Sequence, residues 1–182
     1  MSRHETTPPV STTIHLRPVE EPSLETDSAA ATQAVARILG DRCAGGEVIG
    51  LVGMLGSGKT CFVKGLAEGL GVASEKVSSP TFALIHEYEG RLPLCHVDLY
   101  RLNALDALHG LGLEEYTESG GITVIEWADK APAVLPSHHL LVRFEPLEGD
   151  RRRLAFSPHG SRYELLVAEL LARWAGHRMD PR

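Results

Sequence analysis

Long apolar runs are missing from this chain, since none of its hydrophobic stretches approaches the roughly 20 residues that a bilayer-spanning helix needs. The N-terminal stretch MSRHETTPPVST also lacks the apolar centre of a signal peptide, which predicts a cytoplasmic protein without membrane contact. Only three cysteines occur, Cys43, Cys61 and Cys95, and their spacing matches no metal-binding pattern. We therefore expect small thiols, buried or half-buried, in a reducing compartment.

Positive charge is also scarce. The chain has 18 Lys and Arg against 24 Asp and Glu, and a formal net charge of -6 at pH 7. Broad binding of duplex or single-stranded nucleic acid depends on neutralising phosphates, so this balance argues against DNA binding. If an RNA is involved, we expect other proteins to hold it.

The composition is otherwise that of one ordinary globular domain. Of 182 residues, 43% are hydrophobic and 23% are charged, which is enough for a single core. Prolines among Ser, Thr and Glu predict a mostly flexible tail over residues 1–25, in which TTIHL is a weak candidate for an edge strand. We expect the domain itself over 26–175 and a C-terminal tail over 176–182.

Hydrophobic periodicity and turn residues locate the elements. The pattern predicts helices over 28–43, 60–71 and 161–176, helical pieces over 103–120, strands over 47–52, 81–90, 91–102 and 121–130, and a hairpin over 139–158. The first helix has Asp27 or Ser28 as its cap, and the last is expected to direct Leu165, Leu166, Leu170 and Leu171 inward. This order predicts an α/β fold: a single P-loop NTPase-type domain with a mixed central sheet flanked by helices.

The stretch GMLGSGKT matches the phosphate-loop pattern of Gly, four free positions, then Gly-Lys-Thr, and lies between a predicted strand and a predicted helix. Glycines let the backbone approach phosphate, and successive N–H groups form an anion nest at the positive end of the helix. The pattern places Lys59 at the β- and γ-phosphates and the Thr60 hydroxyl on Mg²⁺. The residues predicted to contact the nucleotide here are Gly53, Leu55, Gly56, Ser57, Gly58, Lys59, Thr60 and Cys61.

Two acids close apolar strands, where a metal and an attacking water would need them. Asp98 ends LCHVD and Glu126 ends ITVIE, so either can serve Mg²⁺ or can simply cap a loop. Ser79-Pro80-Thr81 precedes a strand and is either a simple turn or a switch-like loop that brings Thr81 to the γ-phosphate.

The sequence specifies the base of the nucleotide less strongly than the phosphates. The guanine-reading Asn-Lys-x-Asp pattern is absent, which favours ATP. Trp127 either stacks on the base or fills the sheet edge. The run Arg151–Arg153 at the hairpin tip is either a solvated face or the source of one arginine that folds over the nucleotide.

Taken in order, the motifs GMLGSGKT, SSPTF, HVDLYRL, LGLEEY and VIEW resemble the TsaE family, also called YjeE. Its members are small ATPases of bacterial tRNA threonylcarbamoyladenosine synthesis. The resemblance covers residues from about 26 to 155, and it makes the Ser79-Pro80-Thr81 turn a switch element. One departure is Met54, which replaces a commoner acidic residue in the loop and so removes a charge near the site.

The resemblance also implies roles for individual residues. Catalytic roles fall on Lys59, Asp98 and Glu126, and Mg²⁺ binding falls on Thr60, Asp98 and Glu126. Nucleotide contacts outside the loop fall on Thr32, Thr81, Trp127 and Arg151, with Arg152 as the alternative arginine.

The function that the resemblance implies is ATP hydrolysis in the formation of the threonylcarbamoyl group on the adenosine next to the tRNA anticodon. In similar proteins ATP and Mg²⁺ are the cofactors, and the protein docks on the TsaD–TsaB transferase pair and resets it, so tRNA contact is indirect. Two alternatives stay open: a small-molecule kinase of the P-loop class, and a nucleotide-gated binding module with negligible hydrolysis. Glu126 argues against the second, because a strand-end glutamate positions water.

Overall fold

The computed structural model describes residues 21–102, 112, 115–116 and 120–179. The weak strand candidate TTIHL and most of the helical pieces predicted over 103–120 lie outside these described residues. Among the described residues, no helix is both long and apolar enough to span a membrane.

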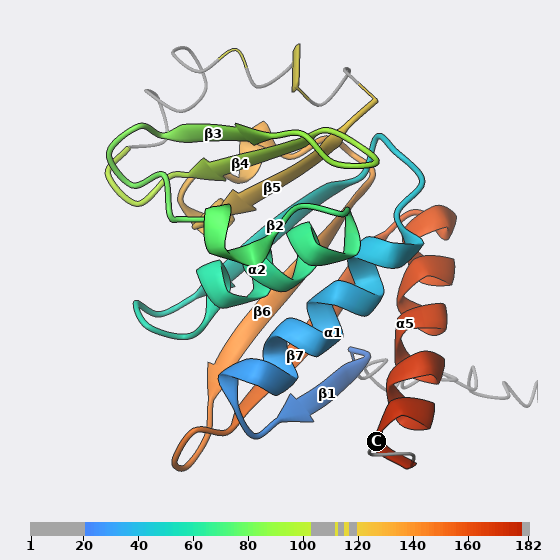
Figure 1. Cartoon of the computed structure of the whole chain (residues 1–182). Helices are drawn as coiled ribbons and strands as arrows, with labels where there is room; N and C mark the ends of the chain where they lie inside the picture. The colour runs from blue at the N-terminus through green and yellow to red at the C-terminus, as the bar shows by residue number, and fades with distance from the viewer. Residues whose placement is uncertain (1–20, 103–111, 113–114, 117–119, 180–182) are drawn as a thin grey trace, which may run out of the picture.

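A single sheet forms the centre of the molecule, with the strand order β1-β7-β6-β2-β5-β4-β3 (Figure 1). The strands are β1 (Ser23–Thr26), β2 (Val48–Gly53), β3 (Ile85–Tyr88), β4 (Leu94–Asp98), β5 (Ile122–Glu126), β6 (His139–Pro146) and β7 (Arg152–His159). Strands β6, β2, β5 and β4 are parallel neighbours, whereas β3, β7 and β1 pair antiparallel at the two sides. The predicted mixed sheet is therefore confirmed.

Helices pack on this sheet, with α1 and α2 in front of it and α5 beside α1 in the view of Figure 1. They are α1 (Ala29–Arg42), α2 (Lys59–Gly69) and α5 (Ser161–Met179), and the short 3-10 helices are η1 (Ser74–Lys76), η2 (Ala128–Lys130) and η3 (Pro132–Val134). Ser28 is the cap of α1, because its Oγ accepts a hydrogen bond of 3.1 Å from the backbone N–H of Ala31.

Alternation along the strands divides the core between the two faces of the sheet. Ile49, Leu94 and Val124 belong to the larger cluster, which lies under α1, α2 and α5. Val97 and Ile125 belong to a second cluster on the other face, where η2 and η3 pack. Side chains alternate along a strand with a period of two, so Asp98 lies on the same face of β4 as Leu94, and Glu126 lies on the same face of β5 as Val124. Both acids are therefore on the face of the sheet that the helices cover.

The ends of the chain differ from the sequence prediction in three places. β1 begins at Ser23, inside the predicted tail, and pairs with β7. α5 continues to Met179, past the predicted end at residue 176. In α5 the prediction for Leu165 is wrong: this side chain is 63% exposed, and Tyr163 and Val167 are buried beside Leu166 and Leu170. Leu171 is half-buried against the core, in agreement with its predicted direction.

Candidate nucleotide-binding site

The phosphate loop joins the end of β2 to the start of α2. Gly56 and Gly58 adopt positive φ angles of 77° and 106°, which side-chain-bearing residues rarely adopt. Gly58 is also the N-cap of α2, so the free N–H groups of the first turn and the positive end of the helix face the loop. This is the backbone arrangement that the sequence pattern predicts, and it suits an anion.

Lys59 lies folded back inside the loop. Its Nζ donates hydrogen bonds to the carbonyl oxygens of Gly53 at 2.8 Å and Met54 at 3.0 Å. The same ammonium lies 3.6 Å from the centroid of the Trp127 ring, a cation–π contact. Burial lowers the pKa of Lys59 from its ordinary value, and the charges of Glu126, Asp129 and Asp98 act in the opposite direction. Bound phosphates would add to the second effect and favour the charged ammonium.

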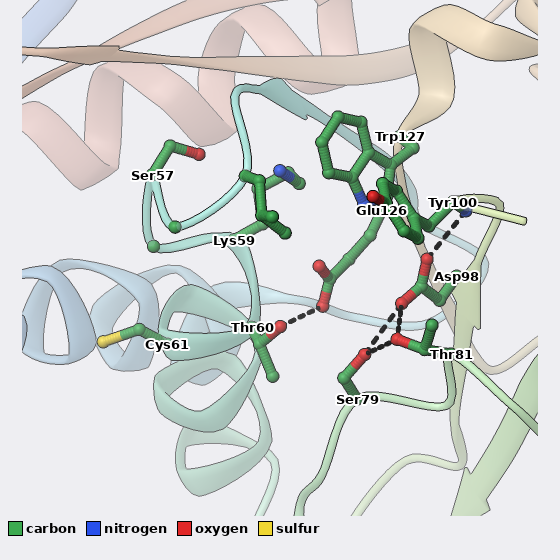
Figure 2. A pocket seen from close by; sticks show the side chains of 13 residues that line it. Ser57, Lys59, Thr60, Cys61, Ser79, Thr81, Asp98, Tyr100, Glu126 and Trp127 are labelled. Carbon is green, nitrogen blue, oxygen red and sulfur yellow. Dashed lines mark hydrogen bonds between the residues drawn. The ribbon is translucent and has the colours of Figure 1, made fainter.

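The two predicted acids lie side by side at the ends of neighbouring parallel strands. Asp98 of β4 is in register with Glu126 of β5, and both side chains are buried. The Thr60 hydroxyl donates a hydrogen bond of 2.8 Å to Glu126 Oε1, which connects the start of α2 to the end of β5 (Figure 2). Three of the predicted metal-binding oxygens are thus brought to one place.

The predicted switch element reaches the same place from the other side. The hydroxyls of Ser79 and Thr81 both donate to Asp98 Oδ2, at 2.7 and 2.6 Å, and the backbone N–H of Tyr100 donates to Oδ1 at 2.8 Å (Figure 2). Asp98 therefore has its two oxygens engaged by separate segments. The turn is more than a connection before a strand, since it is bound to an acid of the site.

These residues surround a cavity of about 280 Å³. Its lining residues are Leu55, Gly56, Ser57, Gly58, Lys59, Thr60, Cys61, Ser79, Thr81, Asp98, Tyr100, Glu126 and Trp127. This volume is close to the lower end of the roughly 300–1,000 Å³ that is usual for ligand pockets. The lining includes both the phosphate loop and Trp127.

Three residues predicted to contact nucleotide do not line this cavity. Gly53 contributes only its carbonyl to Lys59. Thr32 is buried, and its hydroxyl is engaged by Thr26 at 2.9 Å and by the Ser28 carbonyl at 3.0 Å. Arg151 is bound to Glu25 on β1, with 2.6 Å between Nη2 and Oε2.

Of the two candidate arginines, the structure brings Arg152 to the loop. A Cβ atom placed on Gly58 would lie 2.8 Å from Arg152 Nη1, so the guanidinium covers the glycine at the start of α2. Arg151 directly precedes β7 and is turned to Glu25, so the geometry favours the alternative arginine, Arg152, and a nucleotide contact by either stays a prediction.

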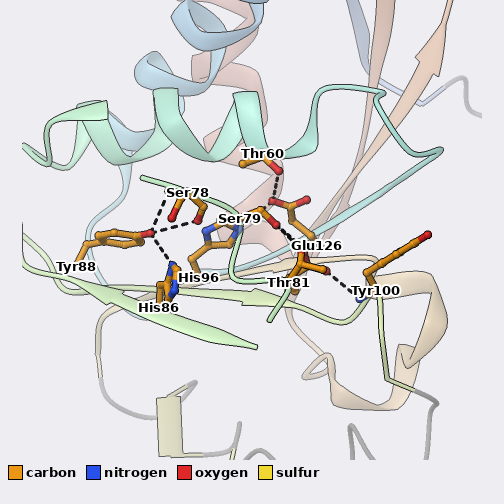
Figure 3. Close-up of polar contacts among 10 residues, drawn as sticks. Thr60, Ser78, Ser79, Thr81, His86, Tyr88, His96, Tyr100 and Glu126 are labelled. Carbon is orange, nitrogen blue, oxygen red and sulfur yellow. Dashed lines mark hydrogen bonds and ion pairs between the residues drawn. The ribbon is translucent and has the colours of Figure 1, made fainter. Parts of the chain in front are cut away.

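Two residues near the cavity were not predicted. Tyr100 lines it and its ring lies 5.1 Å from that of Trp127, centroid to centroid. His96 is buried behind Glu126, with 2.9 Å between Nε2 and Oε1 (Figure 3). A signal for His96 was present, since it precedes Asp98 by two positions on the same strand and so shares its face.

The residues present fit Mg²⁺ together with a polyphosphate. The hydroxyl of Thr60 and the carboxylates of Asp98 and Glu126 are hard oxygen ligands, which Mg²⁺ prefers. Among the described residues, no three His, Cys, Asp or Glu cluster as a dedicated metal cage. Mg²⁺ commonly uses one or two carboxylates and substrate phosphates, so this donor set suits it. The buried Ser57 hydroxyl has no hydrogen-bond partner among the described residues, which leaves a loop donor for a ligand.

Comparison with known proteins agrees with this geometry. A family model described as "Threonylcarbamoyl adenosine biosynthesis protein TsaE" matches residues 26–154, which include the phosphate loop and both strand-end acids. A tRNA threonylcarbamoyladenosine biosynthesis protein TsaE of Bacillus subtilis (strain 168) is 42% identical over 140 residues, or 76% of this chain and 87% of the relative. The protein of the same name from Treponema pallidum (strain Nichols) is 42% identical over 109 residues, or 60% of this chain and 80% of that protein.

A solved structure shows the same fold. The crystal structure of Bacillus subtilis YdiB superposes with a TM-score of 0.73 at 35% sequence identity. The match covers 87% of this chain and 99% of that chain, so the sheet and the helices around the site have counterparts in it.

Proposed function

The chain belongs to the TsaE family, and on that premise we propose that it is a Mg²⁺-dependent ATP hydrolase serving threonylcarbamoyl formation on the adenosine next to the tRNA anticodon. The observation that carries the proposal is the in-register pair of Asp98 and Glu126 facing the phosphate loop, with Thr60 bound to Glu126. A loop alone would hold phosphate, whereas this arrangement also supplies acids for a metal and for water.

Each group has a distinct part in the proposed reaction. When bound, Mg²⁺ would neutralise charge on the phosphates, with Thr60 and Asp98 as its protein ligands. Lys59 leaves its carbonyl partners for the β- and γ-phosphates, and the loop N–H groups hold the same oxygens. Glu126 orients the attacking water from the end of β5. Arg152 adds positive charge at the start of α2.

The proposed partners are a transferase pair like TsaD and TsaB, on which the chain docks and which it resets. Four large hydrophobic residues in or next to the cavity lining are solvent-exposed: Leu55 and Tyr100 line the cavity, and Met54 and Phe82 adjoin the lining residues Leu55 and Thr81 in the chain. We propose that they form part of the docking surface. The exposed fractions of Met54, Leu55, Phe82 and Tyr100 are 69%, 75%, 84% and 42%. The net charge of -6 supports leaving tRNA contact to those partners.

The direct test compares ATP binding and hydrolysis by the purified chain and its Glu126→Gln variant, with Mg²⁺ present. We expect the variant to bind ATP as the parent does and to lose turnover by on the order of a hundredfold or more, the usual loss for a positioned acid–base group. Glu145→Gln, a half-buried acid of β6 that is ion-paired with Arg153, is the matched control and should hydrolyse normally.

Unchanged hydrolysis in Glu126→Gln would remove Glu126 from the mechanism. Production of ADP that rises only when a small-molecule acceptor is added, without partner proteins, would identify a kinase instead.

A further inference from the structure

A buried histidine lies directly behind the proposed catalytic acid. His96 is in the middle of β4 and is fully shielded from solvent, and its Nε2 lies 2.9 Å from Glu126 Oε1 on the neighbouring strand (Figure 3). Its other ring nitrogen, Nδ1, is buried and has no hydrogen-bond partner among the described residues. The ring proton therefore belongs on Nε2, where a carboxylate oxygen accepts it.

The carboxylate of Glu126 is held on one side only. Oε1 accepts from both Thr60 Oγ1, at 2.8 Å, and His96, at 2.9 Å. No described residue hydrogen-bonds to Oε2, and Figure 2 shows this second oxygen directed into the cavity. The two donors therefore fix the plane of the carboxylate and leave one oxygen free to act.

Packing alone does not explain a histidine at this position. Leu94, two residues earlier on the same face of β4, belongs to the apolar core, and an apolar side chain at position 96 would continue it. The histidine instead leaves one buried nitrogen without a partner, which opposes folding and calls for an explanation.

We propose that His96 is a positioning residue for Glu126, an inference that rests on the proposed ATP hydrolysis. Its Nε2–H holds Oε1 and so keeps Oε2 toward the reacting water. Unlike Thr60, which the proposed function also assigns to Mg²⁺, His96 lies behind the site and serves the carboxylate alone. Supporting groups of this kind typically change activity by roughly 10–100-fold when they are removed.

The test uses two variants of similar size at position 96. His96→Gln keeps an N–H donor at nearly the same reach, whereas His96→Met fills the space without a donor. We expect His96→Met to lower kcat by about 10–100-fold while the ATP dissociation constant changes little, and His96→Gln to recover most of the loss. His86→Met is the matched control, because His86 is paired with His96 across β3 and β4 but contacts Tyr88.

A double-mutant cycle with Glu126→Gln distinguishes a role of His96 in positioning Glu126 from an effect of His96 on turnover that is independent of Glu126. If His96 acts through Glu126, adding His96→Met to Glu126→Gln should cause little further loss, because the interaction is already gone. Losses that multiply, or full turnover in His96→Met, would overturn the inference. Full turnover in Glu126→Gln would instead overturn the proposed function, so the two failures are distinguishable.

A spectroscopic measurement checks the contact without turnover. Imidazole ¹H–¹⁵N spectra of the nucleotide-free chain should show the His96 proton on Nε2, shifted by the Glu126→Gln substitution and unaffected by Glu145→Gln. A proton on Nδ1 would contradict the inference even where a variant at position 96 proves too unstable to assay.

Discussion

Arg152 shows how a single position on a strand decides whether a charge belongs to the site. Arg151 directly precedes β7 and is bound to Glu25, and its guanidinium holds the pKa of that carboxyl below the usual range. Arg152 points the other way and covers Gly58 of the phosphate loop. The two neighbours therefore provide a matched pair for testing which charge the nucleotide contacts.

We expect Arg152→Ala to weaken ATP binding by about 10- to 100-fold, since hydrogen bonds to charged groups contribute roughly 1.5–3 kcal/mol. Arg151→Ala should leave ATP affinity within about twofold, because it removes only an exposed ion pair. Isothermal titration calorimetry with ATP measures both. Equal effects of the two substitutions, or a larger effect of Arg151→Ala, would refute this assignment.

The sequence is sufficient to predict a site residue where a motif fixes its spacing. It is insufficient where packing decides the direction in which a side chain points. The motif pattern locates the phosphate loop, and the strand ends locate Asp98 and Glu126, which the structure brings to one cavity with the loop. Arg151 and Arg152 are both within alignment error of the family's arginine, and a shift of one residue reverses the face of the sheet on which the side chain lies. Nothing in the sequence showed that the Thr32 hydroxyl would be engaged by Thr26 and the Ser28 carbonyl.

Among the elements, the segment between η1 and β3 is held at both of its ends. The Tyr88 hydroxyl contacts the backbone of Ser78 at 3.3 Å (Figure 3), and the hydroxyls of Ser79 and Thr81 are bound to Asp98 (Figure 2). Leu84 adopts an unusual positive φ of 68°, and its carbonyl accepts from the backbone N–H of Asp98 at 3.0 Å. In the proposed cycle, Mg²⁺ and the γ-phosphate compete for Asp98 and Thr81, so nucleotide binding would change these contacts.

Removing the two hydroxyls should loosen this segment in the nucleotide-free chain. For the double variant Ser79→Ala/Thr81→Val we expect amide hydrogen exchange over residues 81–84 to rise by about tenfold or more, because hydrogen bonds to a charged acceptor are lost. Ser74→Ala, in η1, which has no buried residue, is the control and should leave exchange over 81–84 unchanged. If the double variant exchanges at the parent rate, the hydroxyls do not hold the segment.

The existence of the helices and strands is largely predictable from the sequence, whereas their boundaries are less so. Turn residues at 148–150 and the alternation on either side correctly predicted the β6–β7 hairpin. The strand predicted over 81–90 begins only at Ile85, because Thr81 is drawn to Asp98, a contact between residues distant in the sequence. Leu165 was placed inward by its hydrophobicity alone, whereas the helical phase of α5 turns it to solvent.

At the scale of the whole molecule, the close approach of α1 and α2 supports the site. Gly65 of α2 lies against the backbone of α1, where a Cβ would be 2.1 Å from the Gln33 carbonyl oxygen. Gly69 is equally tight against the Arg37 carbonyl, at 2.3 Å. α2 begins at the phosphate loop, so the seating of this helix also sets the position of the loop.

Gly65→Ala should therefore lower the melting temperature even though alanine favours helices. Overpacking costs about 1–3 kcal/mol, which corresponds to a decrease of about 2–12 °C for a chain of this size. Gly176→Ala, on α5 with no neighbouring atom within 4 Å, is the matched control and should stabilise the protein by about 0.5–1 kcal/mol. Equal melting temperatures for the parent and Gly65→Ala would contradict the close packing.

The class of fold followed from the sequence, but the strand order did not. Strand β2 lies between β5 and β6, which follow one another in the chain, and no local pattern specifies such an arrangement. Strand β1 had too short an apolar pattern to be recognised, and it is held by its pairing with β7.

The central claim is that this chain is an ATPase whose hydrolysis serves a transferase partner. The most direct measurement is ATP hydrolysis by the purified chain with Mg²⁺, alone and with TsaD- and TsaB-like proteins, in the presence and absence of tRNA. We predict slow hydrolysis by the chain alone and strong stimulation by the partners. Rapid hydrolysis that is indifferent to those proteins would contradict the claim and leave only the phosphate site.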